Sequence, residues 1–371
     1  PNMRLLKKLL TGGAALLAIA VIGLAIAIRY EAACEPIDGG DPADSMRAVH
    51  YSCYGGPEVL QLGQHPKPEP KGNELLIRVE SASVNPLDWH FMRGSPYFMR
   101  LTSGIGKPSE TRLGRDFSGV VEVVGPDVTR FGVGDAVFGG AGGAFAEYLL
   151  RTEDFAVAAK PDNVSHAEAA AAPVAALTAL QALRDKGGLQ SGERVLINGA
   201  SGGVGTYAVQ IAKAMGAHVT GVSSARNAER VLALGADAVI DYKTSDYTRL
   251  DAEYDLIVDN VGNHSVLANR RALAPGGRMV MVAGGHGDWL GPVANPLQAL
   301  VISPFIDEQM TMLLAQLKAE DLATIADMMA AGELRSVIDR HYSLEQIAEA
   351  VEYSESGRAR GKIIIDMNAP P

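Results

Sequence analysis

The sequence is poor in cysteine and aromatic residues, and its positive charges are not concentrated anywhere. Its 371 residues contain only two cysteines, Cys34 and Cys53, which excludes a framework of several disulfides and a cysteine-rich zinc lobe. The formal net charge is −10 and no basic stripe occurs, so the composition argues against a nucleic-acid partner. Aromatic residues make up 6% against 47% hydrophobic residues, which is typical of an Ala/Gly/Val-rich α/β protein. The length suffices for two domains.

A long uncharged segment near the amino terminus predicts a membrane helix. Leu9–Ile28 contains no charged residue and follows Arg4, Lys7 and Lys8. A helix of this length spans about 30 Å, which is one bilayer core, so we predict a retained single-pass anchor with the lipid bilayer as partner of residues 9–28. The flanking charges favour the main domain outside, whereas a nicotinamide enzyme works inside the cell. The localisation is therefore predicted as membrane-anchored, with the side left open.

A stretch rich in Pro, Gly and acidic residues follows the apolar segment. Residues 31–45 are predicted to be a flexible linker, and residues 1–30 to be the anchor. Cys34 lies in this linker. It is interpreted as a free thiol, with a lipid-modified cysteine as the alternative because an apolar segment precedes it.

The folded body begins near Met46 and changes character part-way. Its first part has short apolar runs separated by glycine and proline turns, which predicts an all-β, barrel-like unit. Strand and helix patterns then alternate, which predicts right-handed βαβ crossovers and a parallel sheet. The predicted domains are a barrel over 46–168, a dinucleotide-binding domain over 169–308 and a return to the first domain over 309–371. The fold class is α/β.

A glycine-rich turn between a buried strand and a helix predicts a pyrophosphate site. Val195, Leu196 and Ile197 form the apolar run, and a helical pattern begins at Val204. Glycines let the backbone approach phosphates, and a helix start offers free N–H groups. An ordinary strand–helix turn is the alternative interpretation. The candidate cofactor-binding residues of the turn are Ala200, Ser201, Gly202, Gly203, Val204 and Gly205.

The second strand of the dinucleotide unit lacks the acid that NAD sites place at its end. No acidic residue occurs between Lys213 and Glu229, and the strand end carries Ser223, Ser224 and Arg226 instead. Hydroxyls and a cation suit a 2′-phosphate, so we predict NADPH (NADP) as cofactor. The alternative for Arg226 is an ordinary surface arginine.

Several motifs in this order resemble the medium-chain dehydrogenase/reductase superfamily, and most closely its zinc-independent quinone oxidoreductases and reticulon-interacting oxidoreductases. The resemblance covers Met46–Met367. It implies a GroES-like β-barrel domain plus a Rossmann doubly wound parallel sheet, with the active site in the cleft between them. The motifs that carry it are Ser83-Val84-Asn85-Pro86-Leu87-Asp88, Gly114-Arg115-Asp116-Phe117-Ser118-Gly119, Phe131 to Gly139, Ala200-Ser201-Gly202-Gly203-Val204-Gly205, Leu234-Gly235-Ala236-Asp237 and Ile240-Asp241-Tyr242.

The same resemblance argues against zinc. Zinc members place a cysteine where this chain has Asn85–Asp88, and a Gly-His-Glu motif where it has Gly114-Arg115-Asp116. An arginine at the histidine position would repel the ion, and a catalytic zinc needs Cys, His or carboxylate ligands. We therefore predict no metal.

The remaining candidate residues come from strand ends and from the resemblance. Asn260 and Gly284 lie at predicted strand ends that should face the nicotinamide. The resemblance implies that Tyr242 contacts the adenosine phosphate side and that Arg360 and Lys362 return toward the cofactor. A capping aromatic is the alternative for Tyr242.

The candidate catalytic residues are Asn85, Asp88 and Tyr97. The resemblance places Asn85 near the nicotinamide ribose or the substrate oxygen. Asn85 and Tyr97 are candidate donors to a developing oxyanion. Asp88 has a turn-capping or salt-bridge role as an equal alternative.

The predicted function is hydride transfer from NADPH to a quinone or an α,β-unsaturated carbonyl. Residues 90–112 and 286–304 are expected to form an apolar substrate mouth, which suggests a small lipophilic substrate. A homodimer is possible. The alternatives are a non-catalytic nucleotide-binding accessory subunit of a membrane complex and a broad-specificity NAD(P)-dependent alcohol dehydrogenase.

Overall fold

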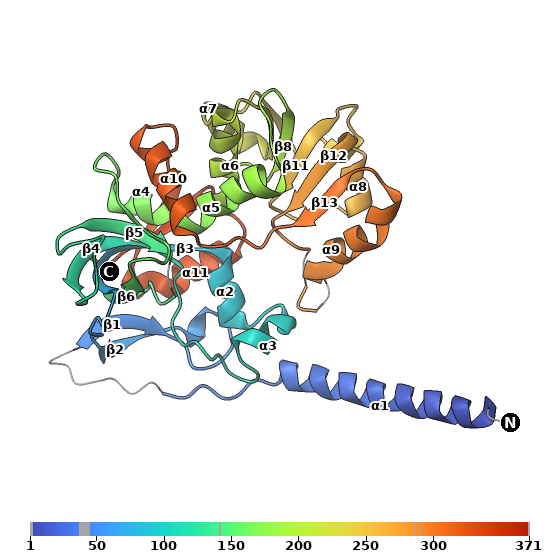
Figure 1. Cartoon of the computed structure of the whole chain (residues 1–371), viewed down its shortest axis with the longest axis horizontal. Coiled ribbons are helices and arrows are strands. Elements are labelled where there is room, and N and C mark those ends of the chain that lie inside the picture. Colours follow the sequence, from blue (N-terminus) through green and yellow to red (C-terminus); the bar gives the residue numbers. More distant parts are fainter. Residues whose placement is uncertain (1–2, 37–44, 141, 286, 290, 370–371) are drawn as a thin grey trace.

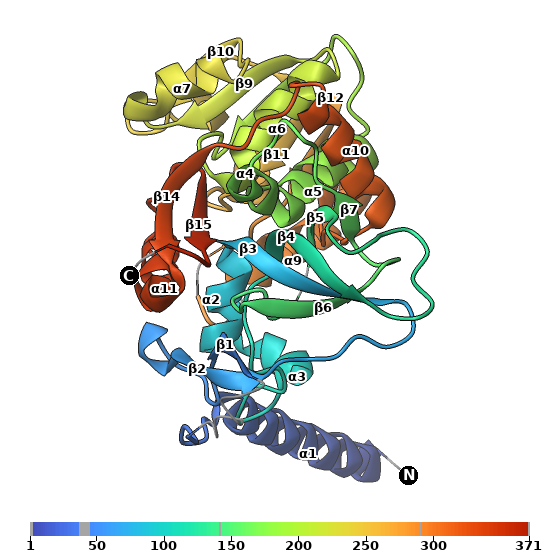
Figure 2. The same ribbon diagram turned by 90° about the vertical axis from the view of Figure 1, so that its left-hand side faces the viewer.

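The computed structural model describes residues 3–36, 45–140, 142–285, 287–289 and 291–369 (Figure 1). A mostly antiparallel barrel and a parallel sheet covered by helices lie side by side, and a long helix, α1, projects from the barrel side (Figures 1 and 2). The predicted α/β fold with a GroES-like barrel and a Rossmann sheet is confirmed.

The barrel domain combines strands from both ends of the chain. Its seven-stranded sheet has the order β14-β15-β3-β4-β5-β7, β6 pairs with β3, and β1 and β2 form a separate hairpin. The last strand, β15, pairs antiparallel with β3. The strands are β1 (Ser45–His50), β2 (Gln61–Pro66), β3 (Glu74–Val84), β4 (Asp116–Val124), β5 (Ala136–Gly140), β6 (Tyr148–Thr152), β7 (Val157–Ala159), β14 (Ile338–Ser343) and β15 (Lys362–Asp366), and the helices are α2 (Pro86–Arg93), α3 (Arg100–Ser103) and α11 (Ile347–Glu355).

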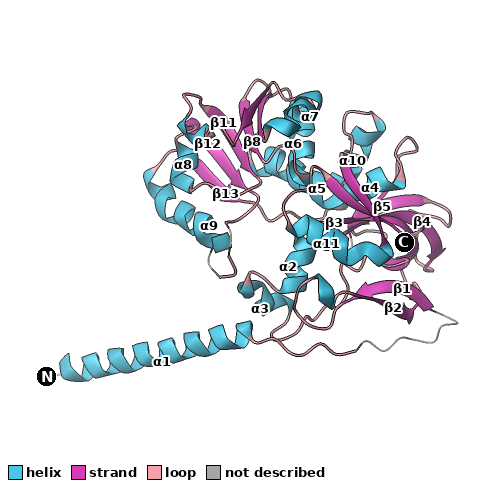
Figure 3. Ribbon diagram, turned by 180° about the vertical axis from the view of Figure 1, so that it is seen from behind, coloured by secondary structure: helices cyan, strands magenta, loops and turns pink. Residues whose placement is uncertain are grey.

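The second domain is a six-stranded parallel sheet of order β10-β9-β8-β11-β12-β13. Helices cover both of its faces (Figure 3). The strands are β8 (Arg194–Asn198), β9 (His218–Ser223), β10 (Ala238–Asp241), β11 (Tyr254–Asp259), β12 (Leu273–Met281) and β13 (Gln309–Met312), and the helices are α5 (Pro173–Gln181), α6 (Gly203–Ala214), α7 (Ala228–Ala233), α8 (Val266–Arg270), α9 (Gly291–Ile302) and α10 (Ala319–Ala330). The preceding helix, α4 (His166–Ala171), packs on the barrel strands β3, β4 and β15.

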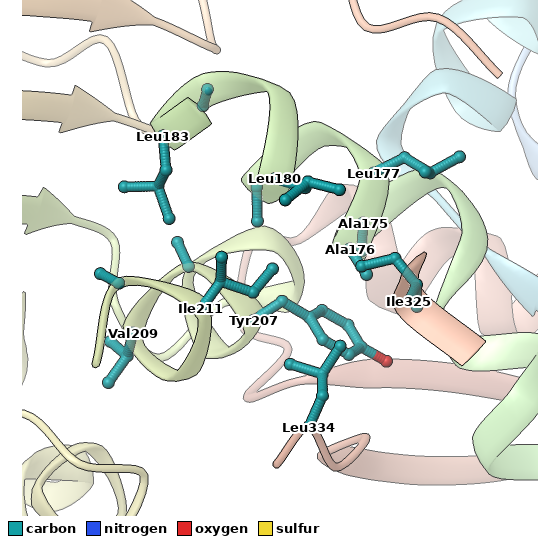
Figure 4. Packing of buried hydrophobic residues seen from close by; sticks show 14 of the residues in the cluster. Ala175, Ala176, Leu177, Leu180, Leu183, Tyr207, Val209, Ile211, Ile325 and Leu334 are labelled. Atoms are coloured by element: carbon teal, nitrogen blue, oxygen red, sulfur yellow. The ribbon is translucent and has the colours of Figure 1, made fainter. Parts of the chain in front are cut away.

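The largest buried cluster joins α5, α6 and α10. Figure 4 shows Leu180 and Leu183 of α5 and the turn that follows it above Tyr207 and Ile211 of α6, with Ile325 of α10 beside them. All of these side chains are at most 5% exposed. This packing fixes the start of α6 against the barrel, because α5 also contacts β4 and β5.

The amino-terminal prediction needs correction. Helix α1 (Met3–Arg29) forms where the apolar segment predicts one. Within the described part of the chain, however, no helix is both long and apolar enough to cross a membrane. A span needs about 20 apolar residues, and the side chains described in α1 are those of Gly13 and residues 17–29. The predicted transmembrane anchor and single-pass localisation are therefore wrong.

The interpretation of Cys34 as a free or lipid-modified thiol is also wrong. Cys34 and Cys53 form a disulfide, with their Cα atoms 4.8 Å apart. Residues 37–44 of the predicted linker lie outside the described residues. The preceding residues contact the barrel domain, because the Ala32 backbone N–H donates to the Gly106 carbonyl at 2.8 Å.

Candidate active site

A buried polar cluster lies where the barrel domain meets the start of α6. Lys362 of β15 donates from Nζ to Asn85 Oδ1 at 2.6 Å and to Asp116 Oδ2 at 3.2 Å. Asn85 Nδ2 donates to the same Asp116 oxygen at 2.9 Å, and so does Ser83 Oγ at 2.9 Å. These four side chains are at most 3% exposed. They form one connected hydrogen-bond network, which we call the Asp116 cluster.

The Asp116 cluster is tied to both domains. The second carboxylate oxygen, Asp116 Oδ1, accepts from the Val174 backbone N–H at 2.9 Å. Val174 lies in the first turn of α5, where a helix favours a negative charge. On the other side, a Cβ added at Gly203 would come within 3.3 Å of Lys362 Cδ. The predicted pyrophosphate turn therefore adjoins the cluster, and the structure brings Asn85 and Lys362 together with Gly203.

The start of α6 has the form that a diphosphate requires. Gly202 is the residue before the first turn and gives no side-chain cap, so the first N–H groups of α6 keep their donors free of any side-chain partner. Gly205 lets the helix approach the strand, because a Cβ there would collide with the Gly199 carbonyl oxygen. The turn is also held from the neighbouring strand, because the Ala200 backbone N–H donates to the Val222 carbonyl of β9 at 3.0 Å.

The loop after β9 lies against the same turn. Asn227 Nδ2 donates to Ser201 Oγ at 3.0 Å and to Ser224 Oγ at 3.3 Å. The Ser223 hydroxyl donates to the Ser224 carbonyl at 3.2 Å, and both serines are buried. Arg226 is exposed, and its guanidinium makes no hydrogen bond or ion pair with any residue that the structure describes.

Two further predicted residues approach this loop from other elements. Tyr242 is 57% exposed, and its backbone N–H donates to the Ser223 carbonyl at 3.2 Å. The Arg360 carbonyl accepts from the Arg230 guanidinium of α7 at 2.8 Å. The exposed cation Arg226, Tyr242 and the 360 segment therefore border one end of the dinucleotide unit.

At the other end of the dinucleotide unit, two buried side-chain oxygens lack a hydrogen-bond partner among the described residues. Asn260 Nδ2 donates to the Asn198 carbonyl at 3.0 Å, but its Oδ1 is buried without a partner in the described part of the chain. Asp259 Oδ2 is likewise buried and unpaired. Because buried polar atoms normally have partners, these acceptors at the ends of β8 and β11 suit a ligand with N–H donors. A carboxamide has such donors.

Gly284 follows β12 and allows a close approach of α9, because a Cβ there would collide with the Pro292 carbonyl oxygen. The expected substrate mouth includes the loop that comes next, of which residues 286 and 290 lie outside the described residues. Tyr97 meets this loop: its backbone N–H donates to the Asp288 carbonyl at 2.7 Å, and its ring packs edge-on against Trp289 at 5.0 Å. Among the described residues, no hydrogen bond or ring contact joins Tyr97 to the Asp116 cluster.

Asp88 makes the turn-capping contact that was the alternative to a catalytic role. Its carboxylate accepts from the Asn85 N–H at 2.8 Å and from the Gly114 N–H at 3.1 Å. It is completely buried, and this desolvation raises its pKa to about 6, although both backbone hydrogen bonds act in the opposite direction. Asp88 therefore fixes the start of α2 and the conformation of Asn85.

Sequence reasoning missed three residues of this region. The sequence indicates Asp116 only as part of a motif, and it does not indicate Asn198 or Asn227 as site residues. The signal for Asp116 was available, because it occupies the acidic position of the Gly-His-Glu motif. Nothing local distinguishes Asn198 or Asn227, whose roles depend on contacts with β11 and with Ser201.

No group of three or more His, Cys, Asp or Glu side chains that could hold a metal ion occurs among the described residues. The absence of zinc remains a prediction.

Comparison with known proteins identifies the family. Residues 71–162 match the alcohol dehydrogenase GroES-like domain, and residues 234–365 match a family described as zinc-binding dehydrogenase. The chain is 36% identical over 337 residues to the chloroplast envelope quinone oxidoreductase homolog of Arabidopsis thaliana, covering 86% of this chain and 98% of the relative. The chain belongs to the medium-chain dehydrogenase/reductase superfamily.

Other relatives agree with this assignment. The mitochondrial NAD(P)H oxidoreductase RTN4IP1 of Mus musculus is 32% identical over 344 residues, which cover 80% of this chain and 82% of that protein. The solved quinone oxidoreductase of Coxiella burnetii superposes with a TM-score of 0.78 at 32% identity, covering 87% of this chain and all of that one. The prediction of an NAD(P)H-dependent oxidoreductase of the quinone-oxidoreductase type is confirmed.

Proposed function

We propose that this chain uses NADPH to reduce a quinone or an α,β-unsaturated carbonyl, without zinc. The observation that carries the proposal is the Asp116 cluster, in which a buried ammonium adjoins the glycine turn. When bound, the cofactor supplies a hydride from its nicotinamide ring. The balanced reaction consumes one acceptor, one NADPH and one proton, and yields hydroquinone or saturated carbonyl plus NADP.

The chain's residues fit the cofactor at three places. The uncapped N–H groups at Gly203–Gly205 suit the diphosphate. The unpaired acceptors Asn260 Oδ1 and Asp259 Oδ2 suit the carboxamide. The exposed Arg226 suits a 2′-phosphate, because no acidic residue occurs between Lys213 and Glu229 to bind a free ribose hydroxyl at the end of β9. Ser223 and Ser224 support this loop rather than offer free hydroxyls, since both are buried and paired with loop atoms.

The donor to the developing oxyanion is assigned differently from the sequence expectation. The amide N–H groups of Asn85 already point to Asp116 Oδ2 at 2.9 Å and to the Ser83 carbonyl at 3.4 Å. The Lys362 ammonium has three N–H donors, and two of them form hydrogen bonds within the cluster. Its third donor is available to a ribose or acceptor oxygen, so in this proposal Asn85 orients Lys362.

The acceptor would enter beside Tyr97. No partner for the Tyr97 hydroxyl is found within the described residues, so this hydroxyl can also donate to a substrate oxygen. The surface around it is apolar: Phe98 is 42% exposed, Leu101 53% and Trp289 43%. A flat lipophilic quinone suits such a surface, and water can deliver the proton.

Charge reversal at Arg226 tests the cofactor assignment. We expect Arg226→Glu to weaken NADPH binding at least about ten-fold, because it replaces a charge-assisted contact by repulsion, while the NADH affinity changes by less than about two-fold. Lys186→Glu is the matched control, since Lys186 is exposed at the end of the segment Ala182–Lys186, on the amino side of β8. Equal NADPH affinities in both variants would show that Arg226 does not bind the 2′-phosphate.

Turnover is measured separately with NADPH, a naphthoquinone panel and simple enones. Consumption of NADPH with an activated acceptor, but not oxidation of a simple alcohol with NADP, supports the proposed reaction. Binding of NADPH without turnover of any acceptor would refute it.

A further inference from the structure

Arg100 is a fully buried cation outside the Asp116 cluster. Its side chain is 0% exposed, and its guanidinium donates to five oxygens. Two lie at the carboxyl end of α2, and three belong to residues 28–31, at the end of α1 and just after it. The acceptors are the carbonyls of Gly94 (2.8 Å), Arg93 (3.0 Å), Ile28 (3.1 Å) and Tyr30 (3.4 Å), and Glu31 Oε1 (2.8 Å).

The same guanidinium lies between two aromatic rings. Its carbon is 4.3 Å from the centre of the Tyr54 ring and 4.8 Å from that of Tyr97. Tyr97 in turn packs against Trp289, which belongs to the loop between β12 and α9. Arg100 thus supports Tyr97, a ring of the expected mouth that contacts residues of both domains.

The segment 28–36 is held by a covalent bond. Cys34 is joined to Cys53, and the neighbour of Cys53 in the chain is Tyr54, the ring that stacks on Arg100. Both ends of the disulfide therefore lead to Arg100, one through Glu31 and the other through Tyr54. Without the bond, residues 31–36 would be held to the barrel by noncovalent contacts. These are the ion pair of Glu31 with Arg100, backbone pairing near Gly106 and the contacts of Glu35 with Ser52 and Lys107.

We propose that Arg100 is a positioning residue for acceptor binding, and that the Cys34–Cys53 disulfide keeps it in place. A dithiol reductant would convert the disulfide into two thiols and itself become a disulfide, with two electrons and two protons transferred. The released segment would withdraw three of the five acceptors of Arg100. A buried guanidinium that loses hydrogen-bond acceptors raises the free energy of the folded state. Arg100 and the Tyr97 ring would therefore leave their positions. The inference rests on the proposed quinone reduction.

Reduction of the disulfide should affect binding of the acceptor but not binding of the cofactor. The dinucleotide residues Gly203, Arg226 and Asn260 do not contact Arg100, whereas Tyr97 does. We therefore expect reduction to raise the KM for a naphthoquinone about ten-fold, the size of one lost charge-assisted hydrogen bond, and to leave the KM for NADPH within about two-fold.

The experiment compares oxidised enzyme, enzyme reduced with dithiothreitol and desalted without air, and the Cys34→Ser/Cys53→Ser variant. Desalting is needed because free dithiols reduce quinones directly. Thiol titration confirms the redox state. Arg100→Met should raise the KM for the naphthoquinone as reduction does. Arg100→Lys, which keeps the positive charge, should raise it less. Arg78→Met is the control, since Arg78 lies on the barrel sheet with surface partners Glu80 and Glu122.

A second readout does not depend on turnover. With Trp89→Phe as background, Trp289 is the only tryptophan. We expect its emission to shift to longer wavelength on reduction, because Tyr97 no longer packs against it. Where Arg100→Met does not fold, the Cys34→Ser/Cys53→Ser variant and the reduced enzyme carry the test.

Four outcomes separate the possibilities. A higher naphthoquinone KM with unchanged NADPH KM and shifted emission supports the inference. Equal KM values and emission in oxidised and reduced enzyme overturn it, as does an equal rise in both KM values, which would indicate general loosening. No NADPH consumption by the oxidised enzyme with any acceptor refutes the proposed function instead, and the emission of Trp289 then decides whether the disulfide positions the ring.

Discussion

Replacing Lys362 by methionine tests whether the buried charge pair of the Asp116 cluster stabilises the fold. The ammonium and the Asp116 carboxylate are 3.2 Å apart, and both side chains are at most 3% exposed. At an effective dielectric constant of about 20, their attraction is about 5 kcal/mol, and the desolvation of the ammonium cancels part of it. Asp116 keeps its donors Ser83, Asn85 and Val174 in the variant. We therefore expect Lys362→Met to lower the free energy of unfolding by about 3 kcal/mol.

The assay is urea unfolding at neutral pH of the wild type, Lys362→Met, Asp116→Asn and the double variant. If the pair interacts directly, the double variant should lose about 2 kcal/mol less than the sum of the single losses. Lys67→Met is the control, because its ion pair with Glu122 is partly exposed and should contribute less than about 1 kcal/mol. Losses that add to within about 0.5 kcal/mol would refute the reasoning, since they would mean that the two charges do not stabilise each other.

Three further predictions concern packing and pH. Gly205→Ala should destabilise the fold by about 2 kcal/mol or more and weaken NADPH binding, because its Cβ meets the Gly199 carbonyl, whereas Gly63→Ala has open space and should change neither; urea unfolding and NADPH titration measure both. Ile325→Ala should cost about 2–5 kcal/mol in thermal or urea unfolding, against less than about 0.5 kcal/mol for the exposed Leu314→Ala. Burial lowers the pKa of His50 to about 4, so its neutral form stabilises the native state above about pH 6.5, and this contribution is lost as the pH falls toward 4; the stability of the wild type relative to His50→Phe should therefore decrease over that range in urea unfolding series.

The raised pKa of Asp88 opposes the effect of His50 on the stability of the native state. The pKa of Asp88 is raised to about 6, so the native state binds a proton there more readily than the unfolded chain does. Asp88 therefore adds stability as the pH falls from about 6 to 4, opposite in sign to His50. Only the comparison with a His50 variant separates the two groups.

The sequence predicts the dinucleotide unit well because that unit is local. The strand β8, the glycine turn and α6 follow one another within residues 194–214, and each has its own pattern: apolar β-branched residues, glycines, then a 3.6-residue period. The start of α5 at Pro173 is equally local, because proline suits the first turn of a helix.

The Asp116 cluster could not be predicted from local pattern. Asp116 and Lys362 are far apart in sequence and meet because β15 pairs with β3, which pairs with β4. A sequence shows that a carboxylate or an ammonium is present, but not that a distant strand buries the two together. Cys34 and Cys53 illustrate the same limit: a thiol in an apparent linker becomes half of a disulfide only because the barrel brings a loop beside it.

The placement of charge assigns different roles to the two ends of the site. At the Asp116 cluster, the cation Lys362 is buried, paired and adjacent to Gly203, so its direction is fixed before any ligand binds. Such preorganisation favours the stabilisation of charge that develops during reaction. At the other end, Arg226 is exposed and unpaired within the described chain, so it can adapt to a phosphate but holds nothing in place. The buried cation therefore suits catalysis and the exposed one suits cofactor choice, which is why their substitution should separate turnover from NADPH preference.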